Sequence, residues 1–248
     1  MRPPASVAVV LLRALLDLAK RCGVPPERVL QAIGASPAEL EGDAAGWIRV
    51  ETLTRGWVLV PALCGDPDFG LHAAESAPTG LYGMLELVVM SSPTVYEALE
   101  RIARMYQLVG GMSEVKLVHD GGNVRVIHRS IVAVEPNRLR HSSEHVLAMI
   151  VSRGRALAAQ EVSPSQVSFA HDSPVSIDEH RRIFRAPIFF SQPYNELVID
   201  HALLLAPLRT PADRQSGDLL RPPSGTERAV VPVPPASRPS QRAMRKRQ

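Results

Sequence analysis

The string HSSEH at residues 141–145 brings together side chains that can bind zinc. His141 and His145 are four positions apart, which places both imidazoles on one face of a helix, and Glu144 lies between them. This H-x-x-E-H spacing is typical of zinc peptidases in which the glutamate acts as the base. No third ligand is identifiable in the sequence, and an ordinary helix turn fits the same residues. A zinc hydrolase is therefore the minor alternative, and we expect no metal.

Other catalytic patterns are incomplete. His171, Asp172 and Ser173 are consecutive in the chain, but consecutive residues do not form a catalytic triad, and the sequence contains no G-x-S-x-G turn. The glycine pairs do not sit between a strand and a helix, so they do not predict a phosphate site. We therefore expect neither an enzyme nor a cofactor.

Adaptable and amphipathic side chains gather between residues 80 and 130. Methionine and tyrosine suit the wall of a small-molecule pocket, because the thioether adapts its shape and the phenol carries a polar tip. His128 follows on a predicted strand, on the same side of a hairpin as His119, and a buried core histidine is the alternative interpretation. Core packing also explains the methionines. The candidate ligand-binding residues are Met84, Tyr96, Tyr106 and His128.

An amphipathic helix is predicted over residues 92–111, SPTVYEALERIARMYQLVGG. Apolar residues recur at helical spacing between Val95 and Tyr106, and Gly110 and Gly111 end the pattern. Ser92 can cap its start, and Thr94 with Glu97 offers a second capping box.

Residues 113–129 alternate as a β-hairpin that turns at Gly121 and Gly122. Short strands are expected at residues 166–171 and 187–200, and residues 80–93 fit either a helix or a buried strand. Further helices are expected at residues 7–21, 25–34, 50–63, 66–76, 136–160 and 176–184, where Ser176 and Glu179 form a capping box. The predicted fold is α+β, a helix-rich domain with small antiparallel hairpins.

The net charge of +3 is unevenly divided along the 248 residues. Residues 221–248 carry a net charge of +6, which leaves residues 1–220 at −3. The body therefore lacks the basic surface of a nucleic-acid-binding domain. Residues 209–248 are rich in proline, serine and arginine without periodicity, so we expect a disordered tail after a domain at residues 1–208.

The remaining sequence features favour a cytoplasmic protein. Cys22 and Cys64 are too few to form a disulfide framework, and both are expected to be buried, reduced thiols. Arg13 and Asp17 interrupt the apolar N-terminal run, which argues against a signal peptide, and no stretch reaches the roughly 20 apolar residues of a membrane span. We expect no membrane contact.

Several segments together resemble the N-terminal sensor domain of AraC-type transcription regulators, in the subgroup with the "arabinose-binding" type of sensor. The resemblance covers residues 11–208. It is carried by GLYG at residues 80–83, SPT at 92–94 and EAL at 97–99, followed by His171, Pro174, Phe184, Pro187 and Phe190.

The resemblance implies a cytoplasmic sensor that binds a small effector, often dimerises, and acts on transcription through a C-terminal module with two helix-turn-helix units. The sequence between Arg209 and Gln248 shows no such pattern, so we expect that module to be missing and direct DNA binding to be absent. The alternative function is a stand-alone dimerising protein that titrates an intact, paralogous regulator.

Overall fold

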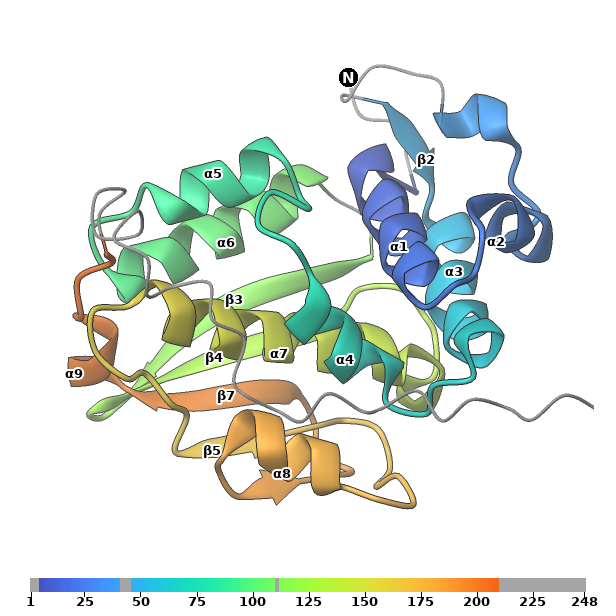
Figure 1. Cartoon of the computed structure of the whole chain (residues 1–248). Coiled ribbons are helices and arrows are strands. Elements are labelled where there is room, and N and C mark those ends of the chain that lie inside the picture. Colours follow the sequence, from blue (N-terminus) through green and yellow to red (C-terminus); the bar gives the residue numbers. More distant parts are fainter. Residues whose placement is uncertain (1–4, 41–45, 110–111, 210–248) are drawn as a thin grey trace, which may run out of the picture.

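The computed structural model describes residues 5–40, 46–109 and 112–209, so the expected tail from residue 210 onward lies outside the described residues. Helices and strands are mixed in an α+β fold, as predicted. Figure 1 shows the helices α1 to α3 gathered at one end of the molecule, while a sheet covered by further helices forms the rest. Two apolar cores follow this division.

The N-terminal part pairs a small two-stranded sheet with three helices. Its elements are β1 (Ser6–Ala8), α1 (Val9–Arg21), α2 (Pro26–Ile33), η1 (Pro37–Leu40), β2 (Trp47–Arg49) and α3 (Val50–Cys64). Ser6 to Ala8 pair antiparallel with β2, so the first helix begins two residues later than predicted. Cys22 follows α1 and is exposed, which corrects the expectation that both thiols are buried.

Three helices follow, namely α4 (Phe69–Ser76), α5 (Met84–Met90) and α6 (Val95–Val109). The ambiguous apolar stretch before Ser92 therefore contains a helix. Thr94 rather than Ser92 caps α6, because the Thr94 hydroxyl accepts the N–H of Glu97 at 3.2 Å. The second of the two predicted caps is confirmed.

Within the described residues, the strands β3 (Ser113–Asp120), β4 (Asn123–Ser130), β5 (Gln166–Ser168), β6 (Ile188–Phe189) and β7 (Asn195–Asp200) form one sheet in the order β3-β4-β7-β5-β6. The hairpin is confirmed: Asp120 faces Asn123 across Gly121, whose positive φ of 59° suits glycine. The long-range pairing of β7 with β4 and the parallel pairing of β5 with β6 were not predicted.

The helices η2 (Pro136–Leu139), α7 (Arg140–Leu157), α8 (Asp178–Phe184) and α9 (His201–Leu204) complete the fold. The single helix predicted over residues 136–160 is therefore a 3-10 turn and an α-helix that ends at Leu157, because Ala158 is extended and bridges Leu208. The predicted capping box of α8 is wrong. Ser176 accepts the N–H of Asp178, but Glu179 turns to His72 on α4 instead.

The long helix α7 lies across the sheet in Figure 1, with α4 beside it. Its apolar residues Leu147 and Val151 pack with Val126 and Leu197 of the sheet in one buried cluster. On the other side, Gly70 of α4 lies directly against the α7 backbone at His141. Within the described ranges, no helix is both long enough and apolar enough to cross a bilayer.

Gly70→Ala tests this close approach of α4 to α7. An added Cβ would lie 2.3 Å from the carbonyl oxygen of His141, so the two helix backbones must separate. We expect the free energy of unfolding to fall by about 1–3 kcal/mol, measured by urea denaturation. Gly154→Ala on α7 is the control, because its Cβ meets nothing within 4 Å and alanine favours a helix by about 0.5–1 kcal/mol. Equal stability of the two variants would contradict this packing.

Candidate functional site

A cavity of about 210 Å³ lies where α5, α6 and α7 meet α1 and α3. For comparison, an engineered apolar cavity of about 150 Å³ binds benzene. The wall is mostly apolar and draws on elements far apart in the sequence, including Leu11, Leu53, Val89, Leu99, Ile102 and Ile150. The wall therefore borders a space large enough for one compact molecule, between the N-terminal helices and the helices that cover the sheet.

The sequence-predicted ligand residues divide between the cavity and the surface. Tyr106 lines the cavity. His128 is buried behind it, with the two rings 6.1 Å apart. Met84 is 72% exposed on α5, and the Tyr96 hydroxyl lies 2.9 Å from Nε2 of His119, so neither side chain belongs to the cavity wall.

His128 is isolated in the core. Its side chain is buried, and neither ring nitrogen has a hydrogen-bond partner among the described residues. Burial lowers the pKa of His128 to about 4, so the imidazole is neutral at pH 7. A core histidine, the alternative interpretation from the sequence, fits this placement.

Tyr82 and His145 form one polar part of the cavity wall. The Tyr82 hydroxyl lies 2.7 Å from Nε2 of His145, and the imidazole also packs against Trp57 with the ring centroids 5.1 Å apart. Burial lowers the pKa of His145 to about 4 and raises the pKa of Tyr82 above its ordinary value. Both groups are therefore uncharged at pH 7, and the Tyr82 hydroxyl retains its proton.

Glu86 and Arg153 form the second polar part of the wall. Nε of Arg153 lies 3.1 Å from Oε1 of Glu86, whose side chain is only 9% exposed. The other carboxylate oxygen accepts the N–H of Gly80 at 2.7 Å, and Nη2 of Arg153 donates to the carbonyls of Ala77 and Pro78. The pair thus fastens α5 and α7 to the loop between α4 and α5.

Sequence reasoning did not single out this ion pair. A signal was available, because Glu86 is the one charged residue in the apolar helix MLELVVM. An isolated carboxylate in an apolar run needs a partner when it is buried. The identity of that partner could not be predicted, since Arg153 lies on a distant helix.

The HSSEH string has a different role from the one its zinc-like spacing suggests. Glu144 is fully buried, and Oε1 accepts hydrogen bonds of 2.7 Å from both Arg140 and His180. Burial alone would raise the pKa of Glu144, but the neighbouring His141 and His180 and the charge of Arg140 hold it well below its usual range. The carboxylate is therefore an ionised packing group that joins α7 to α8.

The two histidines of the string also have protein partners. Nδ1 of His141 lies 3.4 Å from the N–H of Gly70, and His145 faces Tyr82. Within the part of the chain that the structure describes, no group of three or more His, Cys, Asp or Glu side chains could hold a metal ion. The geometry of HSSEH supports helix packing.

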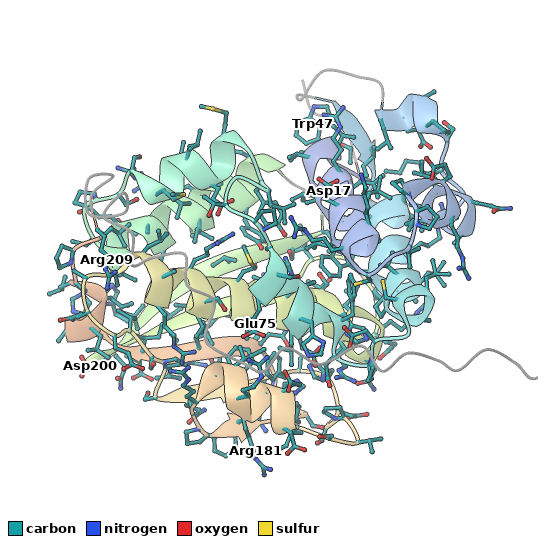
Figure 2. The ribbon with its side chains drawn as sticks, viewed as in Figure 1. Asp17, Trp47, Glu75, Arg181, Asp200 and Arg209 are labelled. Atoms are coloured by element: carbon teal, nitrogen blue, oxygen red, sulfur yellow. The ribbon has the colours of Figure 1, made fainter. Side chains whose placement is uncertain are left out.

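A further network joins α4 to α8 on the outside of the molecule. His72 lies 2.8 Å from Asp66 and 3.1 Å from Glu179, and Arg182 pairs with both Glu75 and Glu179. Partial burial alone would lower the pKa of His72, but the two carboxylates raise it above its ordinary value. Figure 2 labels Glu75 on α4 and Arg181 on α8, which mark these two helices.

Comparison with known proteins shows the family to which the chain belongs. Residues 23–208 match the family described as the N-terminal arabinose-binding domain of AraC transcription regulators, and the chain belongs to this family. The ornithine utilization regulator of Pseudomonas aeruginosa is 26% identical over 208 residues, which cover 82% of this chain and 59% of that regulator. The chain thus spans well under two thirds of the length of this relative. The family and this relative are both transcription regulators.

A solved structure shows the same fold. The crystal structure of the transcriptional regulator CdpR from Pseudomonas aeruginosa matches with a TM-score of 0.53 and 18% identity, over 77% of this chain and 57% of that chain. The resemblance predicted from the sequence is therefore confirmed at the level of family and fold.

Glu144→Gln tests the buried carboxylate. Removing one partner of a buried ion pair typically costs about 3–5 kcal/mol, which we expect at pH 7. Because the folded pKa of Glu144 is depressed, its stabilisation is present above the unfolded value of about 4.3 and is lost as pH falls toward the folded pKa.

The stability gap between native protein and variant should therefore narrow below about pH 4. Urea unfolding from pH 3.5 to 8 measures it. Glu161→Gln, at a carboxylate whose side chain is 70% exposed, serves as the control and should change little at any pH. A gap that stays constant over this range would contradict an ionised Glu144.

Proposed function

We propose that this chain is the small-molecule-sensing part of an AraC-type transcription regulator and that its effector binds in the cavity between α1, α3, α5, α6 and α7. The observation that carries the proposal is a mainly apolar pocket, lined by side chains of α1, α3, α5, α6 and α7, in a domain of this family. Such a cavity removes contacts that a filled core would make, so a ligand that occupies it stabilises the fold.

The cavity wall includes the segment by which the chain leaves the domain. Leu208 lines the cavity, and its N–H donates to the carbonyl of Pro93 at 2.9 Å. The N–H of Arg209 donates to Leu157 at 2.7 Å, and that of Val95 donates to Ala206 at 3.0 Å. Residues 206–209, which we name the exit segment, thus sit between the start of α6 and the end of α7. Figure 2 labels Arg209 at its end.

Occupancy of the cavity would therefore act on the exit segment directly. A ligand that spreads or tightens α6 against α7 changes the geometry of the carbonyls that hold residues 206–209. The shift in population can be no larger than the difference in ligand affinity between the two arrangements. The predicted absence of a helix-turn-helix module between Arg209 and Gln248 concerns residues outside the described ranges and stays a prediction.

A cytoplasmic location is part of the same proposal, because a regulator of transcription acts where its DNA lies. Cell fractionation tests this location, and recovery of the chain in a membrane or secreted fraction would contradict it.

Ala98→Phe tests the cavity as the sensing site. Ala98 lines the cavity, so a phenyl ring there occupies part of the ligand's space. Across a metabolite panel, we expect at least one compound to raise the Tm of the native chain and to slow amide exchange in the exit segment. Neither effect should occur in the variant.

Leu108→Phe, at a side chain 71% exposed on the same helix, is the matched control and should respond as the native chain does. If no compound raises the Tm of native protein, or if the effect survives in Ala98→Phe, the cavity is not the sensing site.

We also propose that the domain dimerises with a second copy of itself through the outer face of α5. Met84, Leu87 and Val88 are exposed there. Exposed apolar side chains in a group mark association surfaces. The inner face of α5 lines the cavity through Glu86 and Val89, so one short helix would connect ligand and partner.

Leu87→Glu tests the dimer by sedimentation velocity at micromolar concentration. We expect the native chain to be a dimer and the variant a monomer, because a carboxylate would lose its hydration in the interface. Val175→Glu, at a fully exposed loop position, should remain a dimer. A monomeric native chain would contradict self-association, and a heterodimer with an intact regulator would favour the titrating function instead.

A further inference from the structure

The polar groups around the cavity define a ligand class, an inference that rests on the proposed sensing function. We propose that the ligand is a compact, uncharged and largely apolar molecule with one hydroxyl or primary amide group, and that this group binds at Glu86 and Arg153.

The size and the wall of the cavity set the body of the ligand. A volume of about 210 Å³ exceeds the roughly 150 Å³ that holds benzene by a few non-hydrogen atoms. Apolar side chains form most of the wall, among them Leu53, Val89, Leu99, Ile102, Met149 and Ile150. A hydroxyl or charge placed against these side chains loses its hydrogen bonds to water without replacement. A substituted aromatic ring or a short alkyl chain fits this environment.

The charges around the cavity cancel. Glu86 and Arg153 carry opposite charges and lie together, while Tyr82 and His145 are uncharged at pH 7. The other polar lining residues include Tyr106, Ser113 and Ser142, and these carry no charge at pH 7. A ligand with a net charge would lose its hydration with no net opposite charge to replace it. The neutral balance of the wall therefore selects a neutral ligand.

The ion pair offers a vacant donor and a vacant acceptor side by side. Oε1 of Glu86 and Nε of Arg153 are buried, lie 3.1 Å apart, and have no hydrogen-bond partner among the described residues. Their other atoms are held by the loop at residues 77–80, so the pair is already oriented. A hydroxyl or a primary amide can donate to Oε1 and accept from the Nε–H at once.

The pair formed by Tyr82 and His145 does not compete for the ligand's polar group. The Tyr82 hydroxyl and Nε2 of His145 already face each other at 2.7 Å. Both also present ring faces and edges to an apolar ligand. The charged anchor of the wall therefore lies at Glu86 and Arg153, and Tyr106, which also carries a hydroxyl, lines the same cavity.

This ligand class differs from the sugar in the family's description and from the amino acid in the relative's name. Arabinose carries several hydroxyls and ornithine carries charged groups at pH 7, and each needs more polar partners than the wall provides. We therefore expect neither arabinose nor ornithine to occupy the cavity of this chain.

Calorimetric titration of the full chain at pH 7 tests the class with small probes of matched shape. We expect p-cresol to bind about tenfold more tightly than toluene, because only p-cresol can engage the anchor. Benzoate, arabinose and ornithine should not bind. Loss of p-cresol binding in Ala98→Phe places the probe in the cavity.

Arg153→Lys tests the anchor, because it keeps the positive charge but removes the Nε–H. We expect this variant to bind p-cresol and toluene equally, and Arg104→Lys, at an exposed position on α6, to keep the tenfold preference. Should Arg153→Lys fail to fold, Glu86→Gln provides the same comparison.

The outcomes separate the two proposals. Equal binding of p-cresol and toluene to the native chain would overturn the anchor. Binding of ornithine, arabinose or benzoate in the cavity would overturn the ligand class while the sensing function stands. If neither these probes nor any compound of the wider metabolite panel binds, the sensing function fails as well.

Discussion

The buried carboxylate of Glu144 is the interaction on which the arrangement of the other helices depends. A charge without water must be fully paired, and Glu144 recruits Arg140 from its own helix and His180 from α8. Arg140 in turn reaches Asp68 just before α4. Glu144 and its partner Arg140 thus connect α7 to α8 and to the segment just before α4, where Gly70 lies against the α7 backbone.

The cavity follows from the same helix. Near the start of α7, Glu144 forms its network of ion pairs, and further along Leu147 and Val151 pack against the sheet. The remaining side faces α6, α5 and the N-terminal helices, whose short and separate segments leave about 210 Å³ unfilled. The ion pair of Arg153 with Glu86 closes this space at the loop beyond α4. Packing and ligand binding therefore share one helix, and Val151 belongs both to the buried cluster and to the cavity wall.

Membership of a sensor family does not by itself specify a ligand. The fold supplies an interior space and an exit segment attached to its wall, while the polar inventory of that wall decides what can occupy it. In this chain the paired polar groups of the wall are few. They are the neutral Tyr82–His145 contact and one ion pair, Glu86–Arg153, with an unpartnered donor and an unpartnered acceptor. The polar groups of the wall thus decide which ligand binds, whereas the hydrogen bonds of residues 206–209 decide how a bound ligand affects the exit segment.

The sequence by itself determined the elements whose signals are local. The Thr94 cap, the stripe of α6 and the Gly121 turn of the hairpin depend on neighbouring residues, and the structure confirms them. Partners distant in the chain were decided only by the tertiary structure. Residue type suggested Met84 and Tyr96 as pocket residues, but the sequence could not say which helix face meets the cavity. Likewise, Arg153 as the partner of Glu86 and His180 as a partner of Glu144 lie on other elements, because the free energy of a buried charge depends on what the fold brings within hydrogen-bonding distance.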